Sequence, residues 1–280
     1  MHVVIDKKPA ATLTWVPPPL HQKEFERLRS LLFQWAGISM NDSKKALISS
    51  RLESRLRHLG MRSFSDYARL VEENTDERQV MVDLLTTNET HFFREPRHFD
   101  YLAAHILPKF ARTGNLKIWS AACSTGEEVY SLAMVLSEHT GHDNWKVYGS
   151  DISRRVLDVA TKAVYPMASA SEIPHHYLSR YCLKGVRSQH GSFTIAPDLR
   201  RRTEFFPMNL NGSWPELDKY HVIFLRNVMI YFDTETRRKL VERMRNQLLP
   251  GGYLIVGHAE SMTVLDGGFT CIRPSIYKLR

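Results

Sequence analysis

The sequence contains few cysteines, and they lie far apart along the chain, at Cys123, Cys182 and Cys271. Three scattered thiols form neither a disulfide framework nor the paired spacing of a zinc site. No segment reaches the roughly 18 apolar residues that a membrane span requires. The first twenty residues also lack the apolar core of a signal peptide. These absences predict a cytoplasmic protein that does not insert into a membrane.

The usual arrangements of catalytic side chains are also missing. The sequence shows no catalytic triad pattern, no paired acid and base, and no spacing typical of metal ligands. The adjacent His175 and His176 and the separate His258 and Glu260 have no partner pattern, and we interpret them as structural or solvated. We therefore predict that the protein holds no metal.

Positive charge, by contrast, is abundant. The 280 residues carry a formal net charge of +8 with a pI near 9.4, which implies an acidic partner such as nucleic acid, a membrane surface or an acidic protein. Composition alone does not choose among these partners. With 43% hydrophobic residues, the chain can bury the core of one large domain and of a smaller one.

The pattern of apolar residues divides the chain into three parts. Residues 1–19 end in "VPPP" and predict a flexible extension. Residues 20–86 have helical apolar spacing throughout, which predicts a small all-helical domain. Residues 87–280 alternate apolar runs such as "LKIWSA" and "HVIFLR" with helical stretches, which predicts an α/β domain with a mostly parallel sheet. An insertion at about 178–203 has the short strand-like pieces of an antiparallel hairpin.

In open α/β sheets the ligand lies beyond the carboxyl ends of the strands, so the residues that follow each strand are the binding candidates. After the first strand, "SAACSTGEE" contains one glycine, Gly126, and lacks the G-x-G-x-x-G fingerprint of pyrophosphate binding. Glu127 and Glu128 would repel a phosphate and favour a ligand with a cationic end. A capping box formed by Thr125 and Glu128 is the alternative interpretation.

The second apolar run, "KVYGSD", ends in Asp151, where dinucleotide-binding folds place the acid that holds a ribose. Asp151 could instead cap the following helix. A ribose without a pyrophosphate, beside a cationic group, describes S-adenosylmethionine. A dinucleotide-dependent oxidoreductase is the competing hypothesis.

Later strand ends add further polar candidates. Asn209 follows the third run and can meet an adenine edge with both a donor and an acceptor. Arg226 follows the apolar residues 222–225 of the fourth run, so it must be paired or functional. Asp233 is explained by a helix N-cap without any function.

The segment at the junction of the two domains, "LLTTNETHFFREPRHF", carries Arg94, which can meet an anion in the cleft. In the same segment, Asn88 and Thr90 could simply cap a helix, and Phe92 and Phe93 could simply be core.

The motifs "LLTTNETHFFRE", "WSAACSTGEEVYSLAM", "GSDIS", "FLRNVMIYFD" and "LLPGGYLIVGHAESM" closely resemble the chemotaxis receptor methyltransferase family, CheR, from about Leu20 to the C-terminus. The resemblance implies a helical N-terminal domain and a class I (Rossmann-like) methyltransferase domain with an inserted small antiparallel β-subdomain. It also implies S-adenosylmethionine as methyl donor, S-adenosylhomocysteine as product, and glutamate side chains of the chemoreceptor cytoplasmic domain as acceptors. The cofactor contacts of the family fall here on Asn88, Thr90, Arg94, Glu128, Asp151, Asn209, Leu210, Arg226 and Asn227.

Methyl transfer to a carboxylate needs no general base, so the catalytic candidates are orienting groups. Arg94 is our candidate for orienting the acceptor or cofactor carboxylate, and Tyr231 for closing the site near the methyl group. Enzymes that methylate exocyclic amines often carry a [DN]-P-P-[YF] motif where this sequence has "RNVMIY", so we expect no nucleic-acid substrate. A nucleic-acid methyltransferase and a noncatalytic receptor-binding adaptor remain the alternatives.

The helix expected over "SKKALISSRLESRLRHLGMR" places Lys44, Arg51, Arg55, His58 and Arg62 on one side, beside an apolar stripe of Ile48, Leu52, Leu56 and Leu59. The resemblance supports receptor binding by this surface, with Lys44, Arg51, Arg55 and Arg57 as contacts, whereas a merely solvated face is the alternative. In the resembled family the β-subdomain of some members binds a C-terminal pentapeptide of receptors, and we expect the hairpin at about Tyr181 to Ala196 to be a docking surface.

Overall fold

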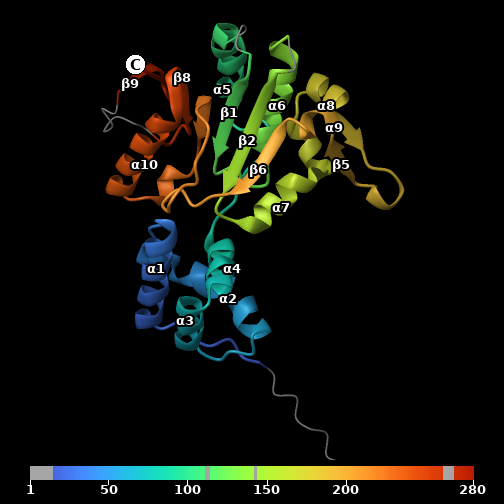
Figure 1. Ribbon diagram of the computed structural model, residues 1–280. Coiled ribbons are helices and arrows are strands. Elements are labelled where there is room, and N and C mark those ends of the chain that lie inside the picture. The colour runs from blue at the N-terminus through green and yellow to red at the C-terminus, as the bar shows by residue number, and fades with distance from the viewer. Residues whose placement is uncertain (1–14, 111–113, 142–143, 261–267) are drawn as a thin grey trace, which may run out of the picture. The chain divides into compact units, whose positions relative to one another are not determined.

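The structure of the protein is a computed structural model that describes residues 15–110, 114–141, 144–260 and 268–280. It consists of two compact units (Figure 1). The first contains residues 41–85 and the chain up to residue 28, and the second contains residues 29–40 and 86–280. Residues 29–40 lie in the range predicted for the helical domain but group with the second unit.

The first unit is helical, as predicted. It contains α2 (Lys45–His58), α3 (Phe64–Glu73), α4 (Thr75–Leu85) and the first part of α1 (Gln22–Ala36). Short polar residues start the helices by accepting backbone hydrogen bonds, as N-caps do. The Ser63 hydroxyl accepts from the second and third residues of α3, and the Asn74 side chain accepts from two amides at the start of α4.

The apolar stripe of α2 is confirmed for Ile48, Leu52 and Leu56, which are buried, whereas Leu59 follows the end of the helix and is half-buried. The basic side of the predicted helix needs correction. A 3₁₀ turn, η1 (Asp42–Lys44), precedes α2, and α2 ends at His58, so Lys44 and Arg62 lie outside it.

The arginines of α2 are engaged within the unit rather than free. Arg51 Nη1 donates to the Leu85 carbonyl at 2.9 Å. Arg55 forms a two-point ion pair with Glu77 of α4, whose side chain is 5% exposed. Arg57 is exposed and pairs with Glu53 at 3.0 Å.

The second unit is built on a seven-stranded sheet of order β6-β2-β1-β7-β8-β10-β9. The strands from β6 to β8 run parallel, and β10 pairs antiparallel with both β8 and β9. This confirms the predicted mostly parallel sheet. The strands are β1 (Leu116–Ala121), β2 (Trp145–Asp151), β6 (Thr203–Pro207), β7 (Tyr220–Leu225), β8 (Leu248–Val256), β9 (Phe269–Arg273) and β10 (Ile276–Leu279).

Helices connect these strands. They are α5 (Arg97–Tyr101), α6 (Glu127–His139), α7 (Arg154–Lys162), α8 (His175–Tyr181), α9 (Pro197–Arg200) and α10 (Thr234–Gln247). A π-helical turn, η2 (Leu102–Ile106), and a 3₁₀ turn, η3 (Leu107–Phe110), continue α5. Shorter 3₁₀ turns are η4 (Met167–Glu172), η5 (Arg187–Gln189) and η6 (Met229–Tyr231). Asp233 caps α10 by accepting from Thr236 N at 2.8 Å, as expected. No helix in the described ranges is both long and apolar enough to span a bilayer.

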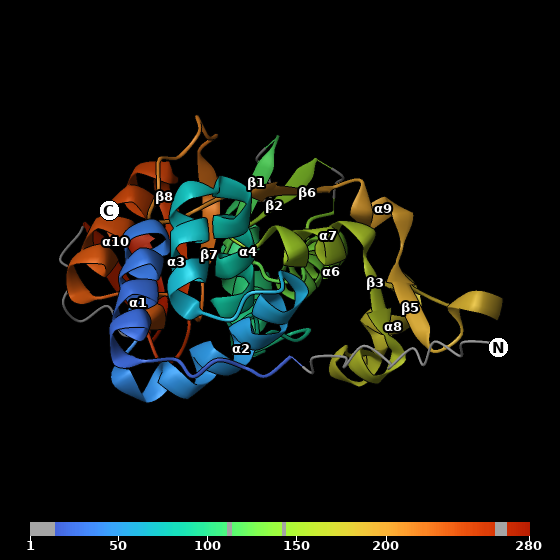
Figure 2. The same ribbon diagram turned by 90° about the horizontal axis from the view of Figure 1, so that it is seen from below.

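A second, small sheet lies beside α8 and apart from the large one (Figure 2). Its order is β3-β5-β4, and both pairings are antiparallel. The predicted hairpin is present as β4 (Cys182–Lys184) and β5 (Ser192–Ile195). A third strand, β3 (Val164–Pro166), was not predicted, and it precedes the range given for the insertion.

The order of the strands determines where a ligand can bind. From β1 the chain passes to β2 on one side of the sheet, and it later returns as β7 on the other side. Such a switch point opens a crevice beyond the carboxyl ends of the two diverging strands. The residues that follow Ala121, Asp151 and Leu225 therefore converge at this end of the sheet.

Candidate active site

The turn after β1 has an unusual backbone. Ala122, Ser124 and Gly126 have φ values of 73°, 50° and 94°. A Cβ at position 126 would lie 2.8 Å from the Cβ of Ala160, so this position requires glycine. The chain thereby reverses within a few residues and starts α6 at Glu127.

The capping-box interpretation of this turn is wrong. Glu128 Oε1 accepts a hydrogen bond from Ser120 Oγ at 2.7 Å, and Thr125 Oγ1 is hydrogen-bonded to Glu127. Glu128 is therefore turned toward the end of β1 rather than toward the start of its own helix. Burial raises the pKa of Glu128, while the nearby Arg226 acts in the opposite direction.

Asp151 at the end of β2 supports the same turn. Its Oδ2 accepts from Ser124 N and its Oδ1 accepts from Ser153 N, both at 2.9 Å. The helix-cap interpretation of Asp151 is wrong, because Ser153 caps α7 by accepting from Val156 N. Asp151 therefore holds the turn after β1 and the start of the segment before α7 from the end of β2.

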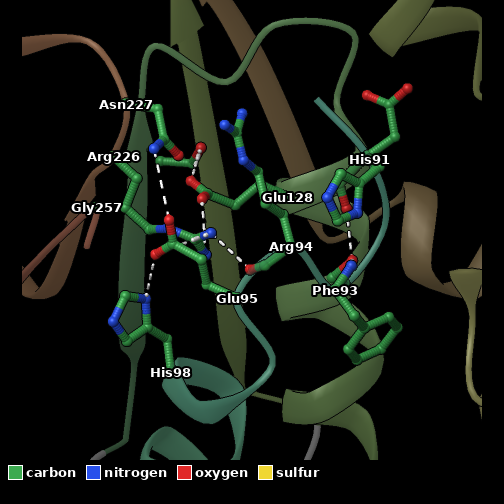
Figure 3. Close-up of polar contacts among 12 residues, drawn as sticks. His91, Phe93, Arg94, Glu95, His98, Glu128, Arg226, Asn227 and Gly257 are labelled. Atoms are coloured by element: carbon green, nitrogen blue, oxygen red, sulfur yellow. Dashed lines mark hydrogen bonds and ion pairs between the residues drawn. The ribbon is translucent and has the colours of Figure 1, made fainter. Parts of the chain in front are cut away.

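Arg226, the first residue after β7, is buried between two acids (Figure 3). Its side chain is 2% exposed, and its Nη1 lies 3.3 Å from Glu128 Oε2. Its Nη2 lies 3.6 Å from Glu95 Oε2 and donates to the Arg94 carbonyl. The expectation that Arg226 is paired or functional is met by this pairing. Arg226 Nε makes no hydrogen bond to any described residue.

The segment before α5 covers this crevice. The Asn88 carbonyl accepts from Ser124 Oγ at 2.9 Å, and Arg94 Nη1 donates to the Glu89 carbonyl at 2.8 Å. Phe92 and Phe93 are buried, in agreement with their interpretation as core. Thr90 is half-buried.

Left-handed backbone is concentrated around the crevice. Positive φ in non-glycine residues costs of order 1–3 kcal/mol each and persists where the surroundings enforce it, often at functional sites. Residues of this kind lie in the segment before α5, in the turn after β1 and directly after β7. They are Phe93, Glu95, Ala122, Ser124 and Asn227.

Two acids at the site were not identified from the sequence. Two opposing influences act on the pKa of Glu95. Burial raises this pKa, but the positive charges of Arg226 and the nearby histidines have the larger combined effect and hold it below its ordinary value. Glu260, interpreted as structural or solvated, is structural. Its buried carboxylate accepts from Asn227 N at 2.6 Å, Gly257 N at 2.8 Å and Met229 N at 2.6 Å, which fixes the loop after β7. Glu260 lies four residues past the end of β8 and could have been examined by the same strand-end rule.

Three residues that were predicted to line the site, Asn209, Leu210 and Tyr231, are not linked to the buried acids by the contacts described next. The Asn209 amide donates to the Trp35 carbonyl and accepts from Asn211 N. The Leu210 carbonyl accepts from Arg243. Tyr231 ends the 3₁₀ turn η6, and its side chain is half-buried. Their roles in binding stay predictions.

The chemistry of the crevice suits a cationic ligand that carries hydroxyl groups. Glu128 and Asp151 provide carboxylate oxygens, and Arg226 places a guanidinium beside Glu128. Acids at the start of α6 oppose a phosphate, which helix N-termini otherwise attract. S-adenosylmethionine has such a set of groups: an ammonium, a sulfonium, a carboxylate and a ribose.

Comparison with known proteins gives concordant matches over nearly the whole chain. The family described as "CheR methyltransferase, SAM binding domain" matches residues 88–277, and "CheR methyltransferase, all-alpha domain" matches residues 23–86. The chemotaxis protein methyltransferase of Escherichia coli (strain K12) is 37% identical over 265 residues, which cover 93% of this chain and 92% of that protein. Chemotaxis protein methyltransferase 2 of Pseudomonas aeruginosa is 40% identical over 243 residues, which cover 86% and 87%.

Proposed function

The chain belongs to the CheR family of S-adenosylmethionine-dependent chemotaxis protein methyltransferases, and from this premise we propose that it methylates glutamate side chains of chemoreceptors. The observation that carries the proposal is the cluster of charged side chains at the β1–β7 switch point. There, Asp151 and Glu128 present carboxylates, the turn has no phosphate-binding features, and Arg226 is held between two acids.

The residues of the chain act by orientation rather than by proton transfer. S-adenosylmethionine supplies a methyl group activated by a sulfonium. A glutamate acceptor has an unperturbed pKa of about 4.3 and is already an anion at neutral pH. The protein must therefore align the acceptor oxygen and exclude water, and good alignment can contribute roughly 7–11 kcal/mol. We assign acceptor or cofactor orientation to Arg94 and closure near the methyl group to Tyr231. Asn88, Thr90, Glu128, Asp151, Asn209, Leu210, Arg226 and Asn227 hold the cofactor.

Incubation with methyl-labelled S-adenosylmethionine and receptor cytoplasmic fragments should transfer label that alkali releases, because methyl esters hydrolyse in base. RNA and DNA in parallel reactions should stay unlabelled. Alkali-stable label, or label in nucleic acid, would contradict the glutamyl ester. Receptor binding without any transfer would favour an adaptor.

We also propose that the basic residues around α2 contact the receptor. Lys44 and Arg57 are exposed, whereas Arg55 is paired with buried Glu77, so reversing Arg55 would disturb the fold as well as recognition. The double variant Lys44→Glu with Arg57→Glu should raise the KM for receptor roughly 3- to 10-fold, as expected for the loss of a few exposed charge pairs. Cofactor affinity should not change.

The matched control for this experiment is Arg238→Glu with Lys239→Glu, two exposed residues of α10. It changes the net charge by the same amount, so it separates local recognition from overall charge. Equal KM values for the two double variants would place receptor recognition elsewhere.

We further propose that β4 of the small sheet docks an extended receptor peptide. β4 is an edge strand, and an edge offers free backbone groups to an added strand. Leu183 and Val186 beside it are 52% and 69% exposed, and Lys184 and Arg187 favour an acidic peptide. Leu183→Asp should weaken binding of peptides from receptor C-termini about 10-fold or more, measured by fluorescence anisotropy.

Val164→Asp is the matched control for peptide docking, because Val164 is 41% exposed on β3, the opposite edge of the same small sheet. Equal loss in both variants, or loss in neither, would argue against docking at β4.

A further inference from the structure

Three potential metal ligands gather behind the crevice. Glu95, His98 and His258 each offer one ligand atom, and these atoms all lie within 4.8 Å of one another. Glu95 Oε2 lies 3.3 Å from His98 Nδ1 and 4.0 Å from His258 Nε2. The sequence does not suggest this group, because His258 lies 163 residues after Glu95.

Several buried polar atoms of this cluster make no hydrogen bond to a described residue, and two of them are the ring nitrogens of His98. Its side chain is 2% exposed, yet neither ring nitrogen makes a hydrogen bond, and Glu95 Oε2 also lacks one. Buried polar atoms nearly always have a partner, so each exception calls for an explanation such as an ion.

We propose that Glu95, His98 and His258 bind a divalent transition-metal ion of the Zn²⁺ class. Two imidazoles and a carboxylate are a donor set that suits zinc, whereas Mg²⁺ prefers oxygen ligands alone. The 3.3 Å between Glu95 and His98 suits two ligands of one tetrahedral ion, whereas the 4.0 Å from Glu95 to His258 is longer and requires His258 to move closer. His258 is 55% exposed on its side chain, so it is free to adjust and leaves an entry path from solvent.

The nearby Arg226 does not exclude a cation. Its guanidinium lies between Glu95 and Glu128, so Glu95 is not its only acidic partner. A metal on Glu95 Oε2 would compete with Arg226 Nη2 for the same oxygen. The proposed metal site is therefore coupled to the cofactor crevice, and metal binding should weaken cofactor binding.

The test is calorimetric titration of the chelator-treated full chain with Zn²⁺ alone. One ion should bind per chain, and Mg²⁺ should give no comparable heat. Losing an outer-shell partner typically costs 10–100-fold in metal affinity, so His258→Ala and His258→Gln should each lower Zn²⁺ affinity by at least about that factor. His190→Ala, which removes an exposed histidine from the connection between β4 and β5, should have no effect. Absent binding, or equal affinity in wild type and both His258 variants, would overturn the proposal.

A second readout examines the coupling. Saturating Zn²⁺ should weaken S-adenosylhomocysteine binding to the wild type and leave that of the His258 variants unchanged. Metal binding without any effect on this affinity would contradict the coupling through Glu95. Because the Zn²⁺ titration needs no methyl transfer, its result is independent of the proposed receptor substrate.

Discussion

Arg226→Ala is expected to destabilise the second unit by about 3–5 kcal/mol, the usual cost of removing one partner from a buried ion pair. The substitution leaves Glu95 and Glu128 near each other, with 14% of each side chain exposed and no guanidinium between them. It also removes the donor to the Arg94 carbonyl. Denaturant unfolding followed by tryptophan fluorescence measures the loss.

Two further variants test whether the stability lost in Arg226→Ala comes from its buried ion pairs. Arg238→Ala removes an exposed arginine with Glu235 as its partner, and it should cost no more than about 1 kcal/mol. Adding Glu128→Gln to Arg226→Ala removes one of the stranded charges and should recover part of the stability. A cost below about 1 kcal/mol for Arg226→Ala alone would mean that the acids do not depend on the guanidinium.

Asp151→Ala is expected to weaken S-adenosylhomocysteine binding by about 1.5–3 kcal/mol, as the loss of a hydrogen bond to a charged group does. The same change leaves the Ser124 and Ser153 amides without their acceptor. Each unsatisfied buried donor costs about 1–3 kcal/mol, so the free energy of unfolding should fall as well. Calorimetry and denaturant unfolding measure the two effects separately.

Asp151→Asn should lose less than alanine in both measurements, because its side-chain oxygen still accepts one backbone hydrogen bond. Asp158→Ala, an exposed acid on α7, is the matched control and should leave both quantities near wild type. If Asp151→Ala lowers the free energy of unfolding but not the affinity for S-adenosylhomocysteine, the carboxylate supports only the turn and does not contact the ribose.

The strand ends were predictable because each buried strand is a short apolar run that stops at a polar residue. Asp151 and Arg226 were found in this way, at the ends of β2 and β7. The partners of Arg226 were not predictable, because Glu95 is 131 positions away in the chain and no local pattern links them. β3 was missed because a strand of three residues shows no periodicity and because, unlike β4, it is not joined to β5 by a short hairpin connection.

Two predictions about individual residues were wrong because partners distant in sequence hold the side chains. Thr125 and Glu128 have capping-box spacing, but a hydroxyl at the end of β1 and the buried guanidinium hold Glu128 instead. The basic side of α2 was predicted from helical periodicity, which carries no information about partners on another helix. Because Glu77 of α4 pairs with Arg55, the positive charge of Arg55 is neutralised within the unit and does not add to the exposed basic surface.

The buried ion cluster also sets the order in which the protein can mature during synthesis. Glu95 leaves the ribosome well before Arg226, which follows 131 residues later, a delay on the order of ten seconds at typical translation rates. During that interval Glu95 and Glu128 have no counter-ion and must stay hydrated. The crevice therefore cannot close on a nascent chain, and a fragment that ends before β7 should be open to proteases and chaperones around its first two strands.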